Sequence, residues 1–240
     1  MPPSEIRAVA VFCGSRVGNH LRFVEAAERL GRLFGEAGVR LVYGGGRIGL
    51  MGRIADACLA AGGQVTGVIP RFLAEREVAH EGVADMRIVE PRRIRTGNGW
   101  GLEHEVPACG NAAGARLQAA PARAALSEAM ELEVNAMHIR KAWMAEEADA
   151  FVMLPGGLGT LDETIEILTW RQLGLHDKPI VLCDVAGSAR PLIAAIEAAI
   201  AFGFAEASVR ALFAVAEGPE AVLPLLAALR ADPRAAAALR

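Results

Sequence analysis

The sequence lacks the features that mark membrane-spanning and nucleic-acid-binding proteins. No stretch of its 240 residues is long and apolar enough to cross a bilayer, and the start, MPPSEIRAVAVF, has no basic residues followed by a long apolar run. The formal net charge of -3 provides no basic surface for nucleic acid or for an anionic membrane. We therefore expect the main partner to be a small molecule.

Cysteine is scarce and scattered. The chain has four cysteines, without a CxxC pair and without histidines at a spacing suited to a metal. Such cysteines are typical of reduced thiols, so we expect a cytoplasmic protein with no metal site. Three of them, Cys13, Cys58 and Cys183, lie in apolar segments and are expected in the core.

The sequence also lacks the signatures of three common sites for phosphate-bearing ligands: the P-loop, the dinucleotide-binding turn and the pyridoxal phosphate site. No Gly-Lys-Ser/Thr follows a glycine run, which excludes an ordinary P-loop NTPase. The first glycine-containing turn lacks the G-x-G-x-x-G spacing, and no acidic residue ends the second predicted strand, so a dinucleotide is disfavoured. With only Lys141 and Lys178 available for a Schiff base, a pyridoxal phosphate decarboxylase has little support.

What the sequence does contain is an alternation of short apolar runs with helical periodicity. With 53% hydrophobic residues, this pattern predicts a single Rossmann-like α/β domain over residues 1–240, a doubly wound parallel sheet covered on both faces. Strands are predicted at 8–13, 40–43, 64–69, 86–89, 151–154, 179–183 and 212–216, and helices at 21–37, 50–61, 136–147, 160–173, 190–202 and 221–229.

The stretch from Phe151 to Gly174 organises this pattern. An apolar strand breaks at Pro155 into PGGLG, and a helix is predicted from Thr160. Glycines expose backbone N–H groups, and a helix start adds unpaired donors, so the turn suits a phosphate. Thr160 is the expected N-cap, with Glu163 completing a capping box; a role for Glu163 in capping alone stays open.

Three turns are expected at the same edge of the sheet. CGSR at 13–16, GGG at 44–46 and PGGLGT at 155–160 each follow a predicted strand, and ligands of parallel sheets bind at this edge. A nucleoside monophosphate or a similar phosphoester fits three such turns. Arg140 and Lys141 on the preceding helix, with Glu77 and Asp162 as nearby acids, are candidate pocket residues.

The pattern fails between Pro91 and Val134. The first half of this insertion carries Gly, Pro, Asn and charge without a period and is predicted to be a long loop, whereas residues 119–133 suit a helix. A lid, a partner-binding element, an obstruction of the pocket and a tolerated surface loop are all open as its role.

Several blocks together resemble the LOG family, the cytokinin riboside 5′-monophosphate phosphoribohydrolases, whose members are often mislabelled lysine decarboxylases. These blocks are CGSR, GGGRIGLMGRIADACLAAGGQVTGVIP and MHIRKAWMAEEADAFVMLPGGLGTLDETIEILTWRQLGLHDKPIVL. The resemblance implies a Rossmann-like fold, usually dimeric, and hydrolysis of the N-glycosidic bond of a nucleoside 5′-monophosphate to free base and ribose 5-phosphate, with no cofactor. The chain departs from the family's MHERK at Ile139.

Carried onto this sequence, the resemblance makes Arg140 and Glu163 the catalytic pair. A carboxylate near C1′ stabilises the positive charge that builds on the sugar, as in glycoside hydrolysis. The remaining residues expected to contact the substrate are Gly45, Gly46, Met51, Glu77, Lys141, Gly156, Gly157, Gly159, Thr160 and Asp162.

Two other classes of function remain open. A non-catalytic nucleotide or cofactor carrier on the same fold would keep the glycine turns without needing Glu163. An oligomeric scaffold would use its helices mainly as an interface, and apolar Leu168, Trp170 and Leu173 make a homodimer an expectation, although the same spacing also suits a core. The base preference is left open.

Overall fold

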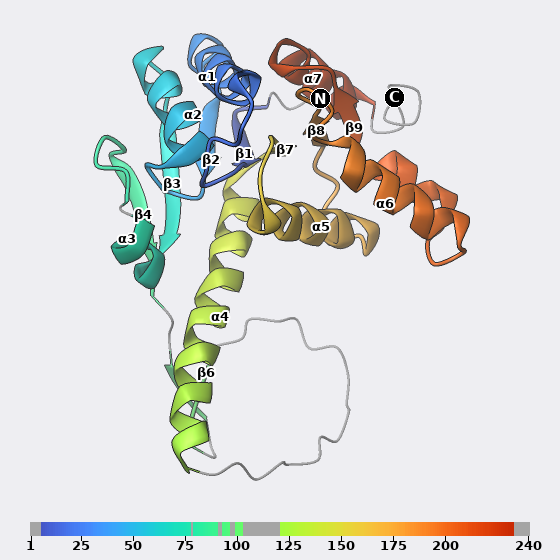
Figure 1. Ribbon diagram of the computed structural model, residues 1–240. Helices are drawn as coiled ribbons and strands as arrows, with labels where there is room; N and C mark the ends of the chain where they lie inside the picture. The colour runs from blue at the N-terminus through green and yellow to red at the C-terminus, as the bar shows by residue number, and fades with distance from the viewer. Residues whose placement is uncertain (1–5, 78, 91–92, 97–98, 103–120, 233–240) are drawn as a thin grey trace.

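The structure, a computed structural model, describes residues 6–77, 79–90, 93–96, 99–102 and 121–232. Its centre is a seven-stranded sheet in which every neighbouring pair is parallel (Figure 1). This confirms the predicted Rossmann-like α/β fold. The strand order is β4 (Asp85–Val89), β3 (Val65–Pro70), β2 (Arg40–Tyr43), β1 (Ala8–Phe12), β7 (Ala150–Met153), β8 (Ile180–Cys183) and β9 (Ala214–Ala216).

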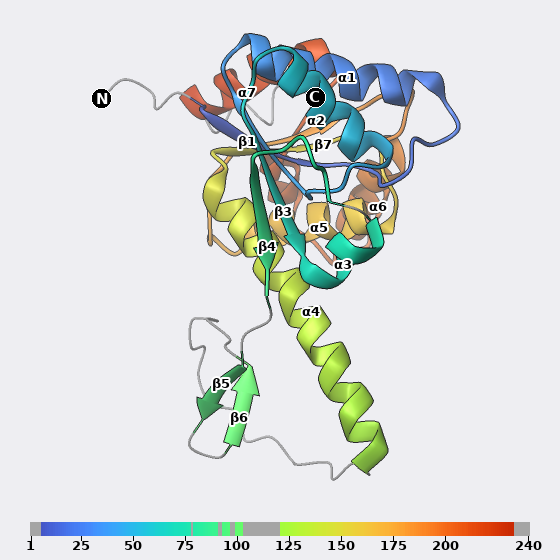
Figure 2. The same cartoon turned by 90° about the vertical axis from the view of Figure 1, so that its left-hand side faces the viewer.

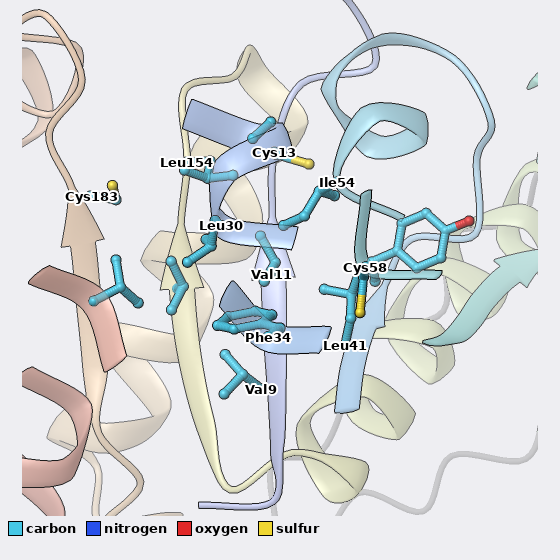
Figure 3. Packing of buried hydrophobic residues seen from close by; sticks show 14 of the residues in the cluster. Val9, Val11, Cys13, Leu30, Phe34, Leu41, Ile54, Cys58, Leu154 and Cys183 are labelled. Atoms are coloured by element: carbon cyan, nitrogen blue, oxygen red, sulfur yellow. The ribbon is translucent and has the colours of Figure 1, made fainter. Parts of the chain in front are cut away.

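Helices cover both faces of the sheet because its strands are apolar on both sides. Val9 and Val11 of β1 pack into one buried cluster with Leu30 and Phe34 (Figure 3), whereas Phe12 packs into the cluster on the opposite face. The first face carries α1 (Leu21–Glu36), α2 (Gly49–Ala60) and α7 (Val222–Ala231), and the second carries α3 (Arg71–Glu77), α4 (Pro121–Glu147), α5 (Leu158–Gln172) and α6 (Arg190–Ala201).

The strand order reverses direction between β1 and β7. The chain moves outward from β1 through β2 and β3 to β4, and then returns to the other side of β1 to build β7, β8 and β9. The turns that leave β1 and β7 therefore diverge to opposite faces, and this is where parallel sheets bind ligands.

All seven predicted strands are present, with ends within two residues of the prediction. The polar segment after β3 contains a helix, α3, for which the sequence shows no clear helical period. The predicted loop at the start of the insertion contains an antiparallel hairpin, β5 (Arg93–Thr96) with β6 (Gly99–Leu102), so the loop prediction is wrong there. Residues 103–120 lie outside the described residues.

The two helices predicted on either side of residue 134 are one continuous helix, α4, of 27 residues. After Pro121 at its first position, this segment has no proline or glycine to interrupt it. Figures 1 and 2 show the first half of α4 projecting away from the sheet, with the β5–β6 hairpin on the same side of the molecule.

The cysteines that the structure describes are core residues. Cys13, Cys58 and Cys183 are buried and free, as predicted, and Cys109 lies outside the described residues. Among the helices described, none combines the length and the apolar character needed to span a membrane.

Candidate functional site

A cavity of about 750 Å³ opens at the carboxyl ends of β1 and β7, where the strand order reverses. The turns after these two strands form much of its wall, and α2, α3 and α4 contribute apolar side chains. Its lining includes Cys13, Gly14, Ser15, Arg16, Val17, Phe23, Gly44, Leu50, Met51, Leu73, Met137, Arg140, Gly156, Gly157, Leu158, Gly159, Thr160, Asp162, Glu163 and Ser188.

Backbone hydrogen bonds hold the turn after β1 against its neighbours. The Gly14 N–H donates to the Pro155 carbonyl at 3.0 Å, and the Leu50 N–H at the start of α2 donates to the Gly14 carbonyl at 2.9 Å. A Cβ at Gly14 would lie 3.3 Å from the Cα of Gly156, so a side chain there would force the two turns apart. The turns after β1 and β7 and the start of α2 are thus held together in the cavity wall.

The glycine turn after β7 presents free backbone donors to the cavity. The first helical hydrogen bond of α5 runs from the Leu161 N–H to the Gly157 carbonyl, which leaves the amides of Leu158, Gly159 and Thr160 without a helical acceptor. A Cβ at Gly157 or Gly159 would meet no heavy atom within 4 Å. These features suit an anion at the positive end of the helix dipole.

The predicted capping box is wrong. Helix α5 begins at Leu158 with Gly157 as N-cap in an extended conformation, so Thr160 is already the third helical residue. The reason lies in the contact of Thr160 with the turn: a Cβ at Gly156 would lie 2.1 Å from the Thr160 hydroxyl oxygen. Glu163 is therefore a residue of the second helical turn and is free to make other contacts.

Arg140 and Glu163 form a buried pair in the cavity wall. Arg140 Nη1 lies 3.3 Å from Glu163 Oε1, and both side chains are 9% exposed. The Arg140 Nε–H donates to the Val68 carbonyl of β3, at 3.1 Å, which fixes the plane of the guanidinium. The structure thus brings together the two residues that the resemblance names as catalytic.

Burial raises the pKa of the Glu163 carboxyl above its ordinary value. The positive charges of Arg140 and Lys141 oppose this rise, whereas the negative charges of Asp162 and Glu166 add to it. The ionisation of Glu163 thus depends on the balance of charges between α4 and α5.

Lys141 does not line the cavity, although it was expected in the substrate pocket. Its side chain is buried, and Nζ lies 3.0 Å from Asp162 Oδ2 and 2.5 Å from Glu166 Oε2. Adjacent residues of a helix point about 100° apart, and here Arg140 points to the cavity while Lys141 points to the acids of α5.

The second glycine turn contributes differently from the expectation. Gly44 lines the cavity, whereas Gly45 and Gly46 are buried and absent from its lining. The Gly46 backbone instead forms a bridge with Ala79. Met51, also expected to contact the substrate, does line the cavity.

Glu77 is the last residue of α3, and its side chain lies outside what the structure describes. Ile139, which replaces the acid of the family motif, packs against the apolar cluster beneath the sheet. It is not among the residues that line the cavity.

Sequence reasoning missed several residues of the cavity wall. The turn of Arg16 was identified, but nothing singled out its side chain. Phe23, Leu73 and Met137 gave only the signal of ordinary apolar helix positions. Cys13 also lines the cavity, but burial raises the pKa of its thiol strongly, so it is not an activated nucleophile.

Comparison with known proteins places the chain in a family. Residues 102–226 match the family model described as possible lysine decarboxylase, and residues 7–103 match the SLOG cluster4 family. The cytokinin riboside 5′-monophosphate phosphoribohydrolase of Rhodococcoides fascians is 37% identical over 218 residues, which cover 90% of this chain and 87% of that protein. The chain belongs to the LOG family.

Other LOG family proteins show the same relationship. The Arabidopsis thaliana cytokinin riboside 5′-monophosphate phosphoribohydrolase LOG1 is 36% identical, with 86% of this chain and 76% of the relative covered. The rice enzyme LOG is 37% identical, with 92% and 74% covered. Several LOG family relatives named for this activity therefore match most of the chain.

Solved structures confirm the fold at lower identity. The molybdenum cofactor binding protein of Rippkaea orientalis superposes with a TM-score of 0.56 at 17% identity, covering 94% of this chain and 98% of that one. The molybdenum cofactor carrier protein of Chlamydomonas reinhardtii gives a TM-score of 0.55 at 18% identity, with 95% and 100% covered. At this identity the likeness concerns the fold.

Proposed function

We propose that the protein hydrolyses the N-glycosidic bond of purine-type nucleoside 5′-monophosphates, including cytokinin ribotides, and releases free base and ribose 5-phosphate. The observation that carries the proposal is the buried Arg140–Glu163 pair in a cavity whose wall continues into the glycine turn at the start of α5. The activity named for the LOG family relatives supports it.

The phosphate binds at the glycine turn. The free amides of Leu158, Gly159 and Thr160 donate to its oxygens, and the helix dipole adds to the attraction. Arg16, exposed at the cavity wall, supplies a cation. No ion pair or side-chain hydrogen bond engages Arg16 within the described part of the chain, so its guanidinium is available to the ligand.

Glu163 acts at the anomeric carbon. It lies five positions after Leu158, about 7.5 Å along the helix axis, which places the carboxylate roughly one ribose ring away from the phosphate donors. As the bond to the base breaks, C1′ becomes positively charged, and an ionised Glu163 stabilises this charge and orients the attacking water.

Arg140 holds Glu163 in its ionised form and in a single orientation. Its guanidinium also presents N–H groups to the cavity, where a positive charge assists the departure of an electron-rich purine. The base lies against the apolar part of the lining, Phe23, Leu50, Met51, Leu73 and Met137, which suits an aromatic ring with an apolar substituent.

The test is a chromatographic assay of the purified protein with adenosine monophosphate and its N6-isopentenyl analogue. We expect free base and ribose 5-phosphate from at least one of them, and a loss of turnover with retained nucleotide binding in Glu163→Gln. Glu146→Gln is the matched control, because Glu146 is an exposed acid on a different helix, α4. Full turnover in Glu163→Gln would overturn the assigned role.

A folded protein that binds the nucleotide without cleaving it would favour the carrier function instead. In that case the insertion at 91–134, which includes the hairpin and the first half of α4, becomes the first segment to delete. Recovery of hydrolysis would identify the insertion as an obstruction.

We further propose a homodimer formed through the exposed side of α5. Leu158 is 86% exposed, and Leu161 and Ile165 follow it on the same side of the helix. Leu168, expected on the surface, is a core residue. Light scattering of the wild type and of Ile165→Glu tests the dimer, because a charge on this side of α5 should leave a monomer.

We also propose that the protein acts in the cytoplasm, since its buried free thiols fit a reducing compartment.

A further inference from the structure

Two consecutive cations of α4 pair with carboxylates of α5 on two different sides. Arg140 faces the cavity and pairs with Glu163, whereas Lys141 faces away from it. The Lys141 ammonium lies between Asp162 and Glu166, 3.0 Å from the first and 2.5 Å from the second. The side chains of Lys141 and Glu166 are 6% and 19% exposed, so their contact is largely buried, whereas Asp162 is 63% exposed where it lines the cavity.

The three carboxylates of α5 lie within little more than one helical turn. Asp162 precedes Glu163 directly, and Glu166 follows it one turn later. Two neighbouring negative charges disfavour the ionised form of a buried carboxylate between them. Without a counter-charge, the partly buried Glu166, and to a smaller extent the more exposed Asp162, would therefore work against the form of Glu163 that the reaction needs.

We propose that Lys141 is a positioning residue, which neutralises Asp162 and Glu166 and so keeps Glu163 ionised and oriented toward Arg140. This inference rests on the proposed phosphoribohydrolase activity. It assigns Lys141 a role behind the cavity wall, in place of a contact with the substrate.

The other charged groups near Glu163 do not replace Lys141. Arg140 already pairs with Glu163 itself, and Cys13 is neutral because burial raises the pKa of its thiol. His138 lies 3.6 Å from Glu166, and its side chain is 61% exposed, so solvent screens its charge as it does that of the 63% exposed Asp162. Burial lowers the pKa of Lys141, yet the hydrogen bonds to Glu166 and Asp162 outweigh this and raise it, so Lys141 stays charged.

The test compares Lys141→Met and Lys141→Arg over the pH profile of kcat/KM. For Lys141→Met we expect the acid limb to move to higher pH, with a loss on the order of tenfold at pH 6 that is largely recovered at pH 8. Lys141→Arg keeps the charge and should keep the wild-type profile. A pH-independent loss in Lys141→Met, or a rise in KM alone, would overturn the inference.

Lys178→Met is the matched control for loss of a partly buried lysine. Lys178 Nζ donates to the Ala145 carbonyl near the end of α4 and contacts no acid of the α5 group. We expect this variant to lose stability without a shift of the acid limb. An equal shift in Lys178→Met would show that the effect is a general loosening of α4.

A double variant and a direct titration keep the inference testable when the single variant is unstable or the wild type is inactive. Lys141→Met with Glu166→Gln removes one excess negative charge, so its acid limb should return toward that of the wild type. Carbon-13 NMR titration of Glu163 should give a higher pKa in folded Lys141→Met than in the wild type, and an intermediate pKa in the double variant. No change in this titration on loss of Lys141 would refute the inference, whereas absence of hydrolysis by the wild type refutes only the proposed function.

Discussion

The guanidinium of Arg140 occupies the space that a side chain at position 44 would fill. A Cβ on Gly44 would lie 2.0 Å from Arg140 Nη2 and 3.2 Å from Met51 Sδ. The turn after β2 thus contributes to the site because Gly44 has no side chain. Gly44 lets the backbone pass close to Arg140 while the guanidinium stays beside Glu163.

Gly44→Ala should displace the Arg140 guanidinium and lower kcat/KM on the order of a hundredfold, because small displacements of a catalytic group are costly. Stability measurements identify the cause. In an Arg140→Ala background the space is vacant, so Gly44→Ala should cost much less stability there than in the wild type. Equal costs in both backgrounds would contradict the steric explanation.

Gly157→Ala should raise KM for the nucleotide and leave the melting temperature nearly unchanged. A Cβ there would meet no protein atom, so it would project into open space next to the proposed phosphate site. Gly156→Ala is the informative comparison, because its Cβ would lie 2.1 Å from the Thr160 hydroxyl oxygen and should destabilise the turn as well. Thermal unfolding and steady-state kinetics separate the two effects.

Arg16→Gln should weaken binding of ribose 5-phosphate by about tenfold, since a charge-assisted hydrogen bond to phosphate is lost. Arg47→Gln is the control, because Arg47 is an exposed arginine of the next turn that does not line the cavity. Calorimetric titration measures both. Equal weakening by the two variants would indicate general attraction of the anion instead of a contact with Arg16.

Glu147→Gln should lower stability at neutral pH by about 1 kcal/mol, a value limited by the partial exposure of the pair. Hydrogen bonds from Arg87, and then from Arg40, lower the pKa of Glu147 in the folded protein below its ordinary value of 4.5. Its contribution is therefore complete above that pH and is lost as the pH falls through the lowered pKa.

Urea unfolding at several pH values checks this. The difference between the wild type and Glu147→Gln should begin to shrink as the pH falls below the ordinary value of 4.5, where the unfolded state takes up the proton, and should vanish below the lowered pKa of the folded state. A difference that stays constant with pH would show that Glu147 contributes through packing alone.

Local patterns of the sequence were sufficient for most of the fold. Short apolar runs predicted all seven strands of the sheet, because most of these strands are buried on both faces and carry mainly apolar residues; β4, with Asp85 and Arg87, is the more exposed exception. The glycine turn after β7 and the Arg140–Lys141 pair were also found from the sequence, because each consists of residues that are adjacent in the chain. The insertion was recognised by its lack of period, but pairing of its hairpin depends on contacts that no local pattern reveals.

The tertiary structure decided how the helices are rotated. Sequence alone placed Arg140 and Lys141 together, but only the packing of α4 against β3 and α5 determined that Arg140 lines the cavity and that Lys141 contacts Asp162 and Glu166 of α5. Packing likewise made Gly44, and not Gly45 or Gly46, the glycine of the cavity wall. Spacing along a chain tells which residues share a side of an element, whereas the burial of that element against its neighbours decides which side meets the ligand.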